Sequence, residues 1–243
     1  MRVVITSPPK MGNKWLKCLL GTVYGLDWIL GDDTPVTGPS GFEQWVAEGN
    51  FRDNAIFHQH CRYSEKICDV CDAVPAHVVT IVRDPYDTFV SMYYWLQTRS
   101  KYDAARGKVR PRERPKDTLI DKPLDDPAVL EFLATTFGEY IRRANDWTNC
   151  GRTVVARYEN LHADAVAELT KVTDQIRPVD RATIDRAIEA CKAENMKSMS
   201  KKMSTHIRSA KVGDSKERLS QAHYDIFRES YADLITSLGY EVR

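Results

Sequence analysis

The chain has 243 residues, 42% of them hydrophobic and 28% charged, which is enough to bury a substantial core without a structural metal or a disulfide framework. Its 35 basic residues nearly balance its 34 acidic residues, for a formal net charge of +1 at pH 7. This balance excludes a protein that coats nucleic acid or an anionic membrane through bulk charge, so we expect neither as a partner and expect any anion site to be local.

Along the chain, short runs rich in β-branched residues alternate with longer stretches of helical periodicity. The predicted strands cover residues 2–6, 55–59, 77–82 and 153–157. The predicted helices cover residues 13–24, 86–96, 129–147 and 163–176. This alternation predicts an α/β fold in a single domain, residues 1–243, with a central parallel sheet flanked by helices that resembles P-loop nucleotide-binding proteins. Ligands of such sheets bind beyond the carboxyl ends of the strands.

Two segments interrupt the alternation. Residues 25–54 are rich in Gly, Pro and Asp and hold aromatic residues available to line an apolar pocket: Trp28, Phe42, Trp45 and Phe51. Residues 97–126 are long and polar, which is typical of a mobile loop that serves as a lid, or else of a solvated excursion without a catalytic role. The aromatic segment favours an apolar acceptor and the basic part of the second segment an acidic one, so acceptor identity stays open.

Cysteine spacing and hydropathy bear on the compartment. Cys68 and Cys71 form a Cys-x-x-Cys pair, but no second pair with metal-ligand spacing follows, so we interpret them as two thiols on one helix face. In a chain of this length we expect all the cysteines to be reduced: Cys18, Cys61, Cys68, Cys71, Cys150 and Cys191. Because no segment approaches the roughly 20 apolar residues of a membrane span, and no apolar leader is visible, we expect a cytoplasmic protein.

The first candidate anion site is the turn after the first predicted strand. Residues 7–15 read Ser-Pro-Pro-Lys-Met-Gly-Asn-Lys-Trp and open a helix. Such a turn aims backbone N–H groups and a helix N-terminus at an anion, and Lys10 and Lys14 add full charges. The turn lacks the first Gly and the final hydroxyl of the nucleoside-triphosphate signature, which disfavours a magnesium-dependent kinase. The alternative interpretation is a turn whose lysines are only solvated.

The second candidate anion site follows the predicted strand at residues 77–82. The chain continues as Arg-Asp-Pro-Tyr-Asp-Thr-Phe-Val-Ser, so Arg83 lies at the carboxyl end of the strand and Ser91 lies inside the next helix. A guanidinium fork with a hydroxyl suits a terminal phosphate monoester. The alternative, a local ion pair of Arg83 with Asp84 or Asp87, leaves Ser91 unexplained.

These blocks resemble the cytosolic-type sulfotransferase family. The first turn is similar to the family's 5′-phosphosulfate loop, Tyr-Pro-Lys-Ser-Gly-Thr-Thr-Trp, and the second block is similar to its 3′-phosphate motif, Arg-Asn/Asp-Pro-x-Asp-x-x-x-Ser. Residues 158–161 resemble its Tyr-Glu-Asp/Asn-Leu, near the adenine, and residues 208–216 resemble its closing loop, Arg-Lys-Gly-x-x-Gly-Asp-Trp-Lys. Departures fall near the adenine, where the stacking Phe is Ala193 and the Trp is Ser215.

The resemblance implies 3′-phosphoadenosine 5′-phosphosulfate (PAPS) as donor, 3′-phosphoadenosine 5′-phosphate (PAP) as product, and no metal. It implies these cofactor-binding residues: Lys10, Met11, Gly12, Asn13, Lys14, Trp15, Arg83, Ser91, Tyr158, Arg208, Ser209, Ala210 and Lys211. Ser209 and Ala210 replace the family's Lys-Gly, and Lys211 supplies the missing charge.

The catalytic residues are expected at the end of the second predicted strand. His58 and His60 flank one residue there, so both side chains point to one face. The family pattern, Lys-Thr-His, aligns His60 with the general base and His58 with the Lys, while Lys10 neutralises the bridging oxygen of the leaving group.

The resemblance therefore implies a sulfotransferase that acts by in-line displacement on a hydroxyl of a small or medium-sized acceptor. The alternatives are a nucleotide or small-molecule kinase on a related fold, and a non-catalytic nucleotide-binding protein. Residues 216–225 faintly resemble the family's dimer segment, which leaves a homodimer open.

Overall fold

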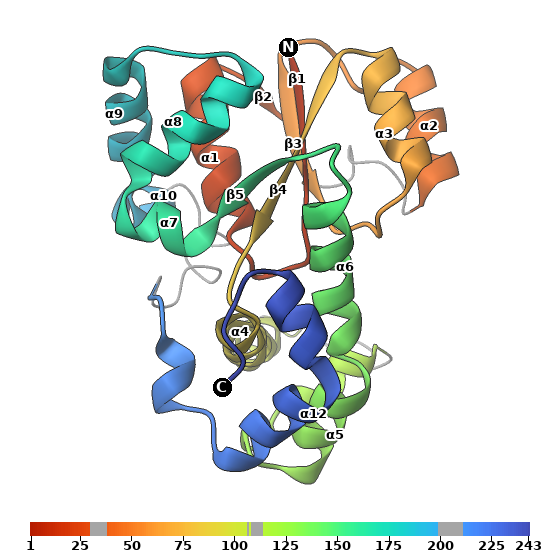
Figure 1. Ribbon diagram of the computed structural model, residues 1–243, viewed down its shortest axis with the longest axis vertical. Helices are drawn as coiled ribbons and strands as arrows, with labels where there is room; N and C mark the ends of the chain where they lie inside the picture. Colours follow the sequence, from red (N-terminus) through yellow and green to blue (C-terminus); the bar gives the residue numbers. More distant parts are fainter. Residues whose placement is uncertain (30–37, 106, 108–113, 199–210) are drawn as a thin grey trace. The chain divides into compact units, whose positions relative to one another are not determined.

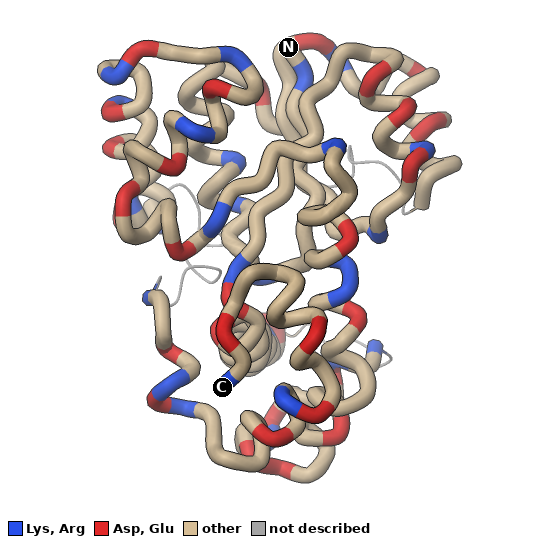
Figure 2. The backbone as a smooth tube through the Cα atoms, in the orientation of Figure 1, with Lys and Arg blue, Asp and Glu red and all other residues tan. Residues whose placement is uncertain are grey.

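The computed structural model describes residues 1–29, 38–105, 107, 114–198 and 211–243. These residues form two compact units, the first made of residues 1–83 and 143–192 and the second of residues 84–142 and 193–243. Figure 1 shows the elements of both units, and Figure 2 shows acidic and basic residues interspersed along the described backbone.

The first unit is built on a five-stranded parallel sheet (Figure 1). Its strands are β1 (Arg2–Thr6), β2 (Asp27–Trp28), β3 (Ala55–Gln59), β4 (Ala76–Val82) and β5 (Val154–Arg157). Their order is β2-β3-β1-β4-β5, with Val4 of β1 paired to Phe57 of β3 and Val78 of β4. The predicted α/β class, with a parallel sheet flanked by helices, is confirmed. The two-residue strand β2 is too short to carry a periodic signal, so it was not predicted.

Helices cover both faces of this sheet (Figure 1). One face carries α2 (Pro39–Ala47) and α3 (Glu65–Ala73), and the other carries α1 (Asn13–Tyr24), α8 (Ala165–Ile176) and α9 (Arg181–Ala190). Short helix α7 (Tyr158–Ala163) follows β5 directly. Successive strand residues alternate between the faces, so Val4, Phe57 and Val78 share one buried cluster while Ile56 lies against Gly21 of α1. Burial on both faces explains why the strand centres contain successive apolar residues, such as Val3, Val4 and Ile5 of β1.

The aromatic residues after α1 belong to the core of the first unit. Phe42, Trp45 and Phe51 are all buried, and the Trp45 ring centroid lies 5.6 Å from that of Phe51 and 5.2 Å from that of Phe57. The expectation that they line an acceptor pocket is wrong. Helix α2, which the sequence analysis did not predict, turns Phe42 and Trp45 onto the sheet, and an aromatic cluster of this kind buries more apolar surface than an open pocket would.

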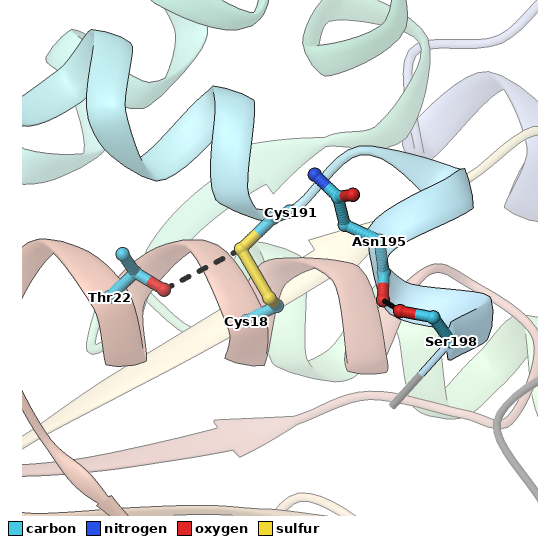
Figure 3. The surroundings of a disulfide bond; sticks show 5 residues. All are labelled: Cys18, Thr22, Cys191, Asn195 and Ser198. Atoms are coloured by element: carbon cyan, nitrogen blue, oxygen red, sulfur yellow. Dashed lines mark hydrogen bonds between the residues drawn. A yellow bond between two sulfur atoms is a disulfide. The ribbon is translucent and has the colours of Figure 1, made fainter. Parts of the chain in front are cut away.

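A disulfide joins Cys18 of α1 to Cys191, the residue that follows α9 (Figure 3). Both cysteines are 1% exposed, and the Thr22 hydroxyl lies 3.6 Å from the Cys191 Sγ. The expectation that all cysteines are reduced is therefore wrong for this pair. Its members lie 173 residues apart in sequence, and only the packing of α9 on α1 brings their Cα atoms to 5.9 Å, within disulfide reach. Disulfides persist mainly in oxidising compartments, so this disulfide does not support the expected cytoplasmic location. That location stays a prediction.

The other four cysteines are free. Burial raises the pKa of Cys61 and Cys71 to about 12 and that of Cys68 to about 11, so these thiols stay protonated and unreactive at neutral pH. Cys68 and Cys71 lie on the buried side of α3, in the core cluster with Phe57. The interpretation of the Cys-x-x-Cys pair as two thiols on one helix face is confirmed.

We expect the disulfide to contribute about 2–5 kcal/mol to the free energy of unfolding, because it closes a long loop in the unfolded chain. A thiol titration of the denatured, unreduced protein should find four thiols, against six after reduction. Reductant should lower the unfolding midpoint of the wild type but not that of the Cys18→Ser/Cys191→Ser variant. Six thiols before reduction, or an equal shift in the variant, would contradict the assignment.

The second unit is helical. Its elements are α4 (Pro85–Ala104), the 3-10 turn η2 (Pro115–Leu119), α5 (Pro127–Thr135), the start of α6 (Gly138–Asn149), α10 (Ala193–Ser198), the 3-10 turn η3 (Asp214–Glu217) and α12 (Gln221–Ser237). No helix in the described parts of either unit is long and apolar enough to cross a membrane.

Two sequence-based boundaries in this unit are wrong. The predicted helix at residues 129–147 is two helices, because the chain turns at Thr136 and Phe137, and Tyr231 packs so closely on Gly138 that a Cβ there would lie 2.5 Å from its ring. Helix α4 continues through residues 97–104 of the predicted loop, supported by the Arg99–Asp103 ion pair one turn apart. Residues 106 and 108–113 of that loop lie outside the described residues, and its role as a lid stays a prediction.

Candidate active site

Four adjacent strands of the first unit end in residues that the sequence analysis singled out. The anion turn follows β1, the His58–His60 pair ends β3, Arg83 follows β4, and Tyr158 follows β5. Because the sheet is parallel, these strand ends share one edge (Figure 1). This is the edge at which sheets of this kind bind ligands.

Buried hydroxyl groups attach the start of the anion turn to β4. The Thr80 Oγ1 donates to the carbonyl of Thr6 at 2.6 Å, and the backbone N–H of Ile81 donates to the Ser7 Oγ at 2.8 Å. The Thr80 proton is used in this way, so the Ser7 hydroxyl, 3.1 Å away, must donate to Thr80. Neither Ser7 nor Thr80 was among the predicted site residues. The only local signals for this pair are a Ser directly after one strand and a Thr inside another.

The turn itself has a left-handed backbone at two positions. Lys10 has φ +75° and Gly12 has φ +105°, and a non-glycine residue in this region is uncommon outside functional sites. The Gly12 carbonyl accepts from the N–H groups of Trp15 and Leu16, which starts α1. The twelve-residue helix thus points its N-terminus and first-turn N–H groups at the turn, as an anion cradle requires.

Some side chains of the turn are accessible to a ligand, and others are buried and stabilise the turn. Lys10, Lys14 and Trp15 are partly exposed. Met11 is buried, and the Asn13 amide donates to the Pro8 carbonyl at 2.8 Å, closing the turn. An anion contact from these two residues would therefore use their backbone N–H groups.

Lys17, on the next turn of α1, is not part of the cradle. Its ammonium group is buried, donates to the Ile29 carbonyl at 2.8 Å and lies 4.8 Å from the centre of the Trp28 ring. Burial, with a smaller contribution from the charge of Lys14, lowers the pKa of Lys17 to about 8. The positive charge offered to an anion in this turn therefore comes from Lys10 and Lys14.

The two histidines at the end of β3 face the same side, as predicted, with ring centroids 5.4 Å apart. His60 is exposed, and its Nδ1 lies 2.6 Å from the Ser7 carbonyl oxygen. A carbonyl can only accept, so Nδ1 carries the proton of the neutral ring and Nε2 carries the lone pair. Arg143, on α6, donates to the His60 carbonyl at 3.5 Å. The anion turn thus sets the tautomer of a histidine able to accept a proton at Nε2.

Arg83 is 7% exposed and contacts both the turn and the end of β5. Its guanidinium carbon lies 4.3 Å from the centroid of the Tyr158 ring, and one guanidinium nitrogen donates to the Lys10 carbonyl at 3.4 Å. Tyr158 also meets the Trp15 ring edge to face, with centroids 5.7 Å apart. Arg83, from the second predicted anion site, thus contacts the backbone of Lys10 in the first.

In the second unit, the acidic residues after Arg83 organise their own surroundings. Asp84 accepts from the N–H groups of Tyr86 and Asp87, capping α4, and forms an ion pair with Arg243. Asp87 accepts from the N–H groups of Gly213 and Ser215 at 2.7 and 2.9 Å. It thereby anchors the segment that resembles the family's closing loop.

Only some of the remaining predicted site residues lie in the described parts of the chain. Ser91 lies on α4 and is partly exposed, and Lys211 is exposed. Arg208, Ser209 and Ala210 lie outside the described residues. Within the described ranges, no group of three or more His, Cys, Asp or Glu side chains could hold a metal ion, and independence from metals stays a prediction.

Comparisons with known proteins agree on one family. The family model for the sulfotransferase domain matches residues 1–239. Mouse sulfotransferase SULT7A1, in complex with PAP, has a similar structure, with a TM-score of 0.69 and 18% identity over 97% of this chain and 84% of that chain.

Retinol dehydratase is also similar in fold. Its complex with androsterone and the inactive cofactor PAP has a TM-score of 0.59 at 12% identity, covering 100% of this chain and 83% of that one. Its complex with retinol and PAP has a TM-score of 0.57 at 14% identity, covering 100% and 84%. No curated protein sequence matches the chain.

Proposed function

Because the chain belongs to the sulfotransferase domain family, we propose that it transfers a sulfuryl group from PAPS to a hydroxyl of a small or medium-sized acceptor. One observation carries the proposal. The anion turn, a histidine whose Nδ1 contacts the Ser7 carbonyl of that turn, and a buried arginine follow three adjacent strands of one parallel sheet. The PAP bound to mouse SULT7A1 and to retinol dehydratase supports the choice of donor.

The residues of the first unit suit a nucleotide with anionic groups at both ends. The N-terminus of α1 and the side chains of Lys10 and Lys14 would hold the 5′-phosphosulfate, and Arg83 would hold the 3′-phosphate. Trp15, partly exposed beside the turn, is the candidate adenine contact. Ser91 and residues 208–211 stay predicted contacts of the 3′-phosphate.

In the proposed reaction His60 Nε2 takes the proton of the acceptor hydroxyl as the oxygen attacks sulfur. The new S–O bond forms as the bond between sulfur and the bridging oxygen of the donor breaks, so the products are the sulfate ester and PAP. Lys10 stabilises the negative charge that develops on the departing phosphate. His58, close to the general base, is the second candidate for a charged contact at the reacting centre.

The acceptor class is proposed from the neighbours alone. Retinol dehydratase binds retinol in one complex and androsterone in another, and both ligands carry a hydroxyl on a largely apolar body. We therefore propose apolar alcohols and phenols as the first acceptors to screen with this chain. Phe42 and Trp45 are core residues, so they do not support the choice of apolar acceptors.

The decisive experiment is calorimetric binding of PAP and of adenosine 5′-phosphate in the presence of a chelator. We expect PAP to bind more tightly, and Arg83→Ala to weaken PAP binding about 10- to 100-fold while leaving adenosine 5′-phosphate unchanged, because a charge-assisted contact to the 3′-phosphate is lost. Arg181→Ala, which removes an exposed arginine from α9, is the matched control.

Equal affinity for the two nucleotides would overturn the proposal. Tight binding of magnesium-ATP with phosphoryl transfer would favour the kinase alternative. Binding of PAP without sulfuryl transfer from PAPS to any alcohol or phenol would favour a non-catalytic nucleotide-binding protein.

A further inference from the structure

The family resemblance implies that Tyr158 contacts the adenine, but other residues of the protein already pack against its ring. It is the first residue of α7 and is 6% exposed. The Arg83 guanidinium lies 4.3 Å from the ring centroid, and the Trp15 ring meets it edge to face. A Cβ added to Gly12 would lie 2.7 Å from the Tyr158 Cδ2, so the backbone of the anion turn packs directly against the ring.

One ring therefore supports parts of both anion sites. The face of an aromatic ring attracts a cation, and this attraction is strongest where water is excluded, as it is around the nearly buried Arg83. The same ring limits how closely the Gly12 backbone can approach β4 and β5. Arg83 closes the arrangement by donating to the carbonyl of Lys10.

We propose that Tyr158 is a positioning residue for nucleotide recognition. Its ring orients the Arg83 guanidinium toward the 3′-phosphate, and its contact with the Gly12 turn fixes the position from which the ring holds Arg83. The inference rests on the proposed function, which it deepens by assigning the discrimination of 3′-phosphorylated nucleotides to a residue that does not touch the phosphate. An adenine contact would instead serve PAP and adenosine 5′-phosphate alike.

The test compares Tyr158→Phe and Tyr158→Leu by calorimetry with PAP and with adenosine 5′-phosphate. Phe keeps the ring, so the affinity for PAP should stay within about threefold of wild type. Leu removes the ring, so the affinity for PAP should fall about 10- to 30-fold while that for adenosine 5′-phosphate changes less than about threefold. In the double variant Arg83→Ala/Tyr158→Leu, the loss should not exceed that of Arg83→Ala alone, because both changes remove one interaction.

Tyr24→Leu is the matched control. Tyr24 is also buried, also in the first unit, and also stacked by an arginine, Arg177 at 5.2 Å, but it lies at the far end of α1. The ratio of the two nucleotide affinities should not change in this variant. Replacement of the Tyr158 side chain by trifluorophenylalanine keeps the ring shape and weakens its negative face, so it tests the interaction even if Tyr158→Leu fails to fold. Its affinity for PAP should fall below that of Tyr158→Phe.

Several results would overturn the inference while leaving the proposed function intact. In Tyr158→Leu, these results are an unchanged preference for PAP or an equal loss of affinity for both nucleotides. In the double variant, the result is a loss of PAP affinity equal to the sum of the two single losses. In the trifluorophenylalanine variant, it is a PAP affinity equal to that of Tyr158→Phe. A wild type that shows no preference for PAP would instead overturn the proposed function itself.

Discussion

Replacing His60 with alanine should lower kcat for sulfuryl transfer from PAPS about 10²- to 10⁴-fold, the usual contribution of a positioned general base. The affinity for PAP should stay within about threefold, because the positive charges proposed to hold the nucleotide come from Lys10, Lys14 and Arg83. The reason lies in the 2.6 Å contact between His60 Nδ1 and the Ser7 carbonyl, which leaves Nε2 as the proton acceptor. Steady-state rates with an alcohol or phenol acceptor, together with PAP calorimetry, provide the check.

His58→Ala is the matched control, because it removes the same kind of side chain two residues earlier, inside the end of β3. We expect a smaller loss of kcat than for His60→Ala. Full turnover by His60→Ala with a strong loss in His58→Ala would exchange the roles of the two histidines.

Gly12→Ala should lower the affinity for PAP more than 100-fold and destabilise the fold. Gly12 has φ +105°, a conformation that costs a residue with a side chain about 1–3 kcal/mol. The new Cβ would also lie 2.7 Å from the Tyr158 ring and 3.1 Å from Ile81, which adds about 1–3 kcal/mol of overpacking. The turn can relieve the collision only by moving its backbone away from the positions that bind the anion. Denaturant unfolding and calorimetry with PAP measure the two effects.

Gly25→Ala separates backbone strain from collision. Gly25 ends the same helix with φ +63°, but a Cβ there meets no atom within 4 Å among the described residues. This variant should lose only the backbone cost, about 1 kcal/mol of unfolding free energy, and should bind PAP as the wild type does. Equal effects of the two variants would show that the close approach of Gly12 to Tyr158 has no functional consequence.

Local patterns predicted the elements that position the site. The expected strands at residues 2–6 and 55–59 and the expected helix at residues 13–24 have the same bounds as β1, β3 and α1. Their apolar periodicity is unbroken, and glycines at positions 12 and 25 mark the helix ends with backbone conformations that other residues avoid. The candidate residues therefore lie at the strand ends where the sequence analysis expected them.

Elements whose limits depend on distant contacts were less predictable. The helix predicted at residues 129–147 has one helical periodicity throughout, yet it divides where Tyr231, almost 100 residues later, donates its hydroxyl to the Leu133 and Ala134 carbonyls. The aromatic residues after α1 are equally ambiguous in sequence, because a core and an apolar pocket require the same side chains. Only the packing of Trp45 against Phe57 distinguishes the two.

The sequence by itself determined the α/β class, the order of the anion-binding blocks and the place of Lys10, His60 and Arg83 at strand ends, because these depend on residues close together in the chain. The tertiary structure decided what no local pattern records. It joined Cys18 to Cys191, set the proton of His60 on Nδ1, and placed the Tyr158 ring under Arg83. Each of these depends on atoms that lie more than 50 residues apart in sequence, so their chemistry exists only after the sheet and its helices have packed together.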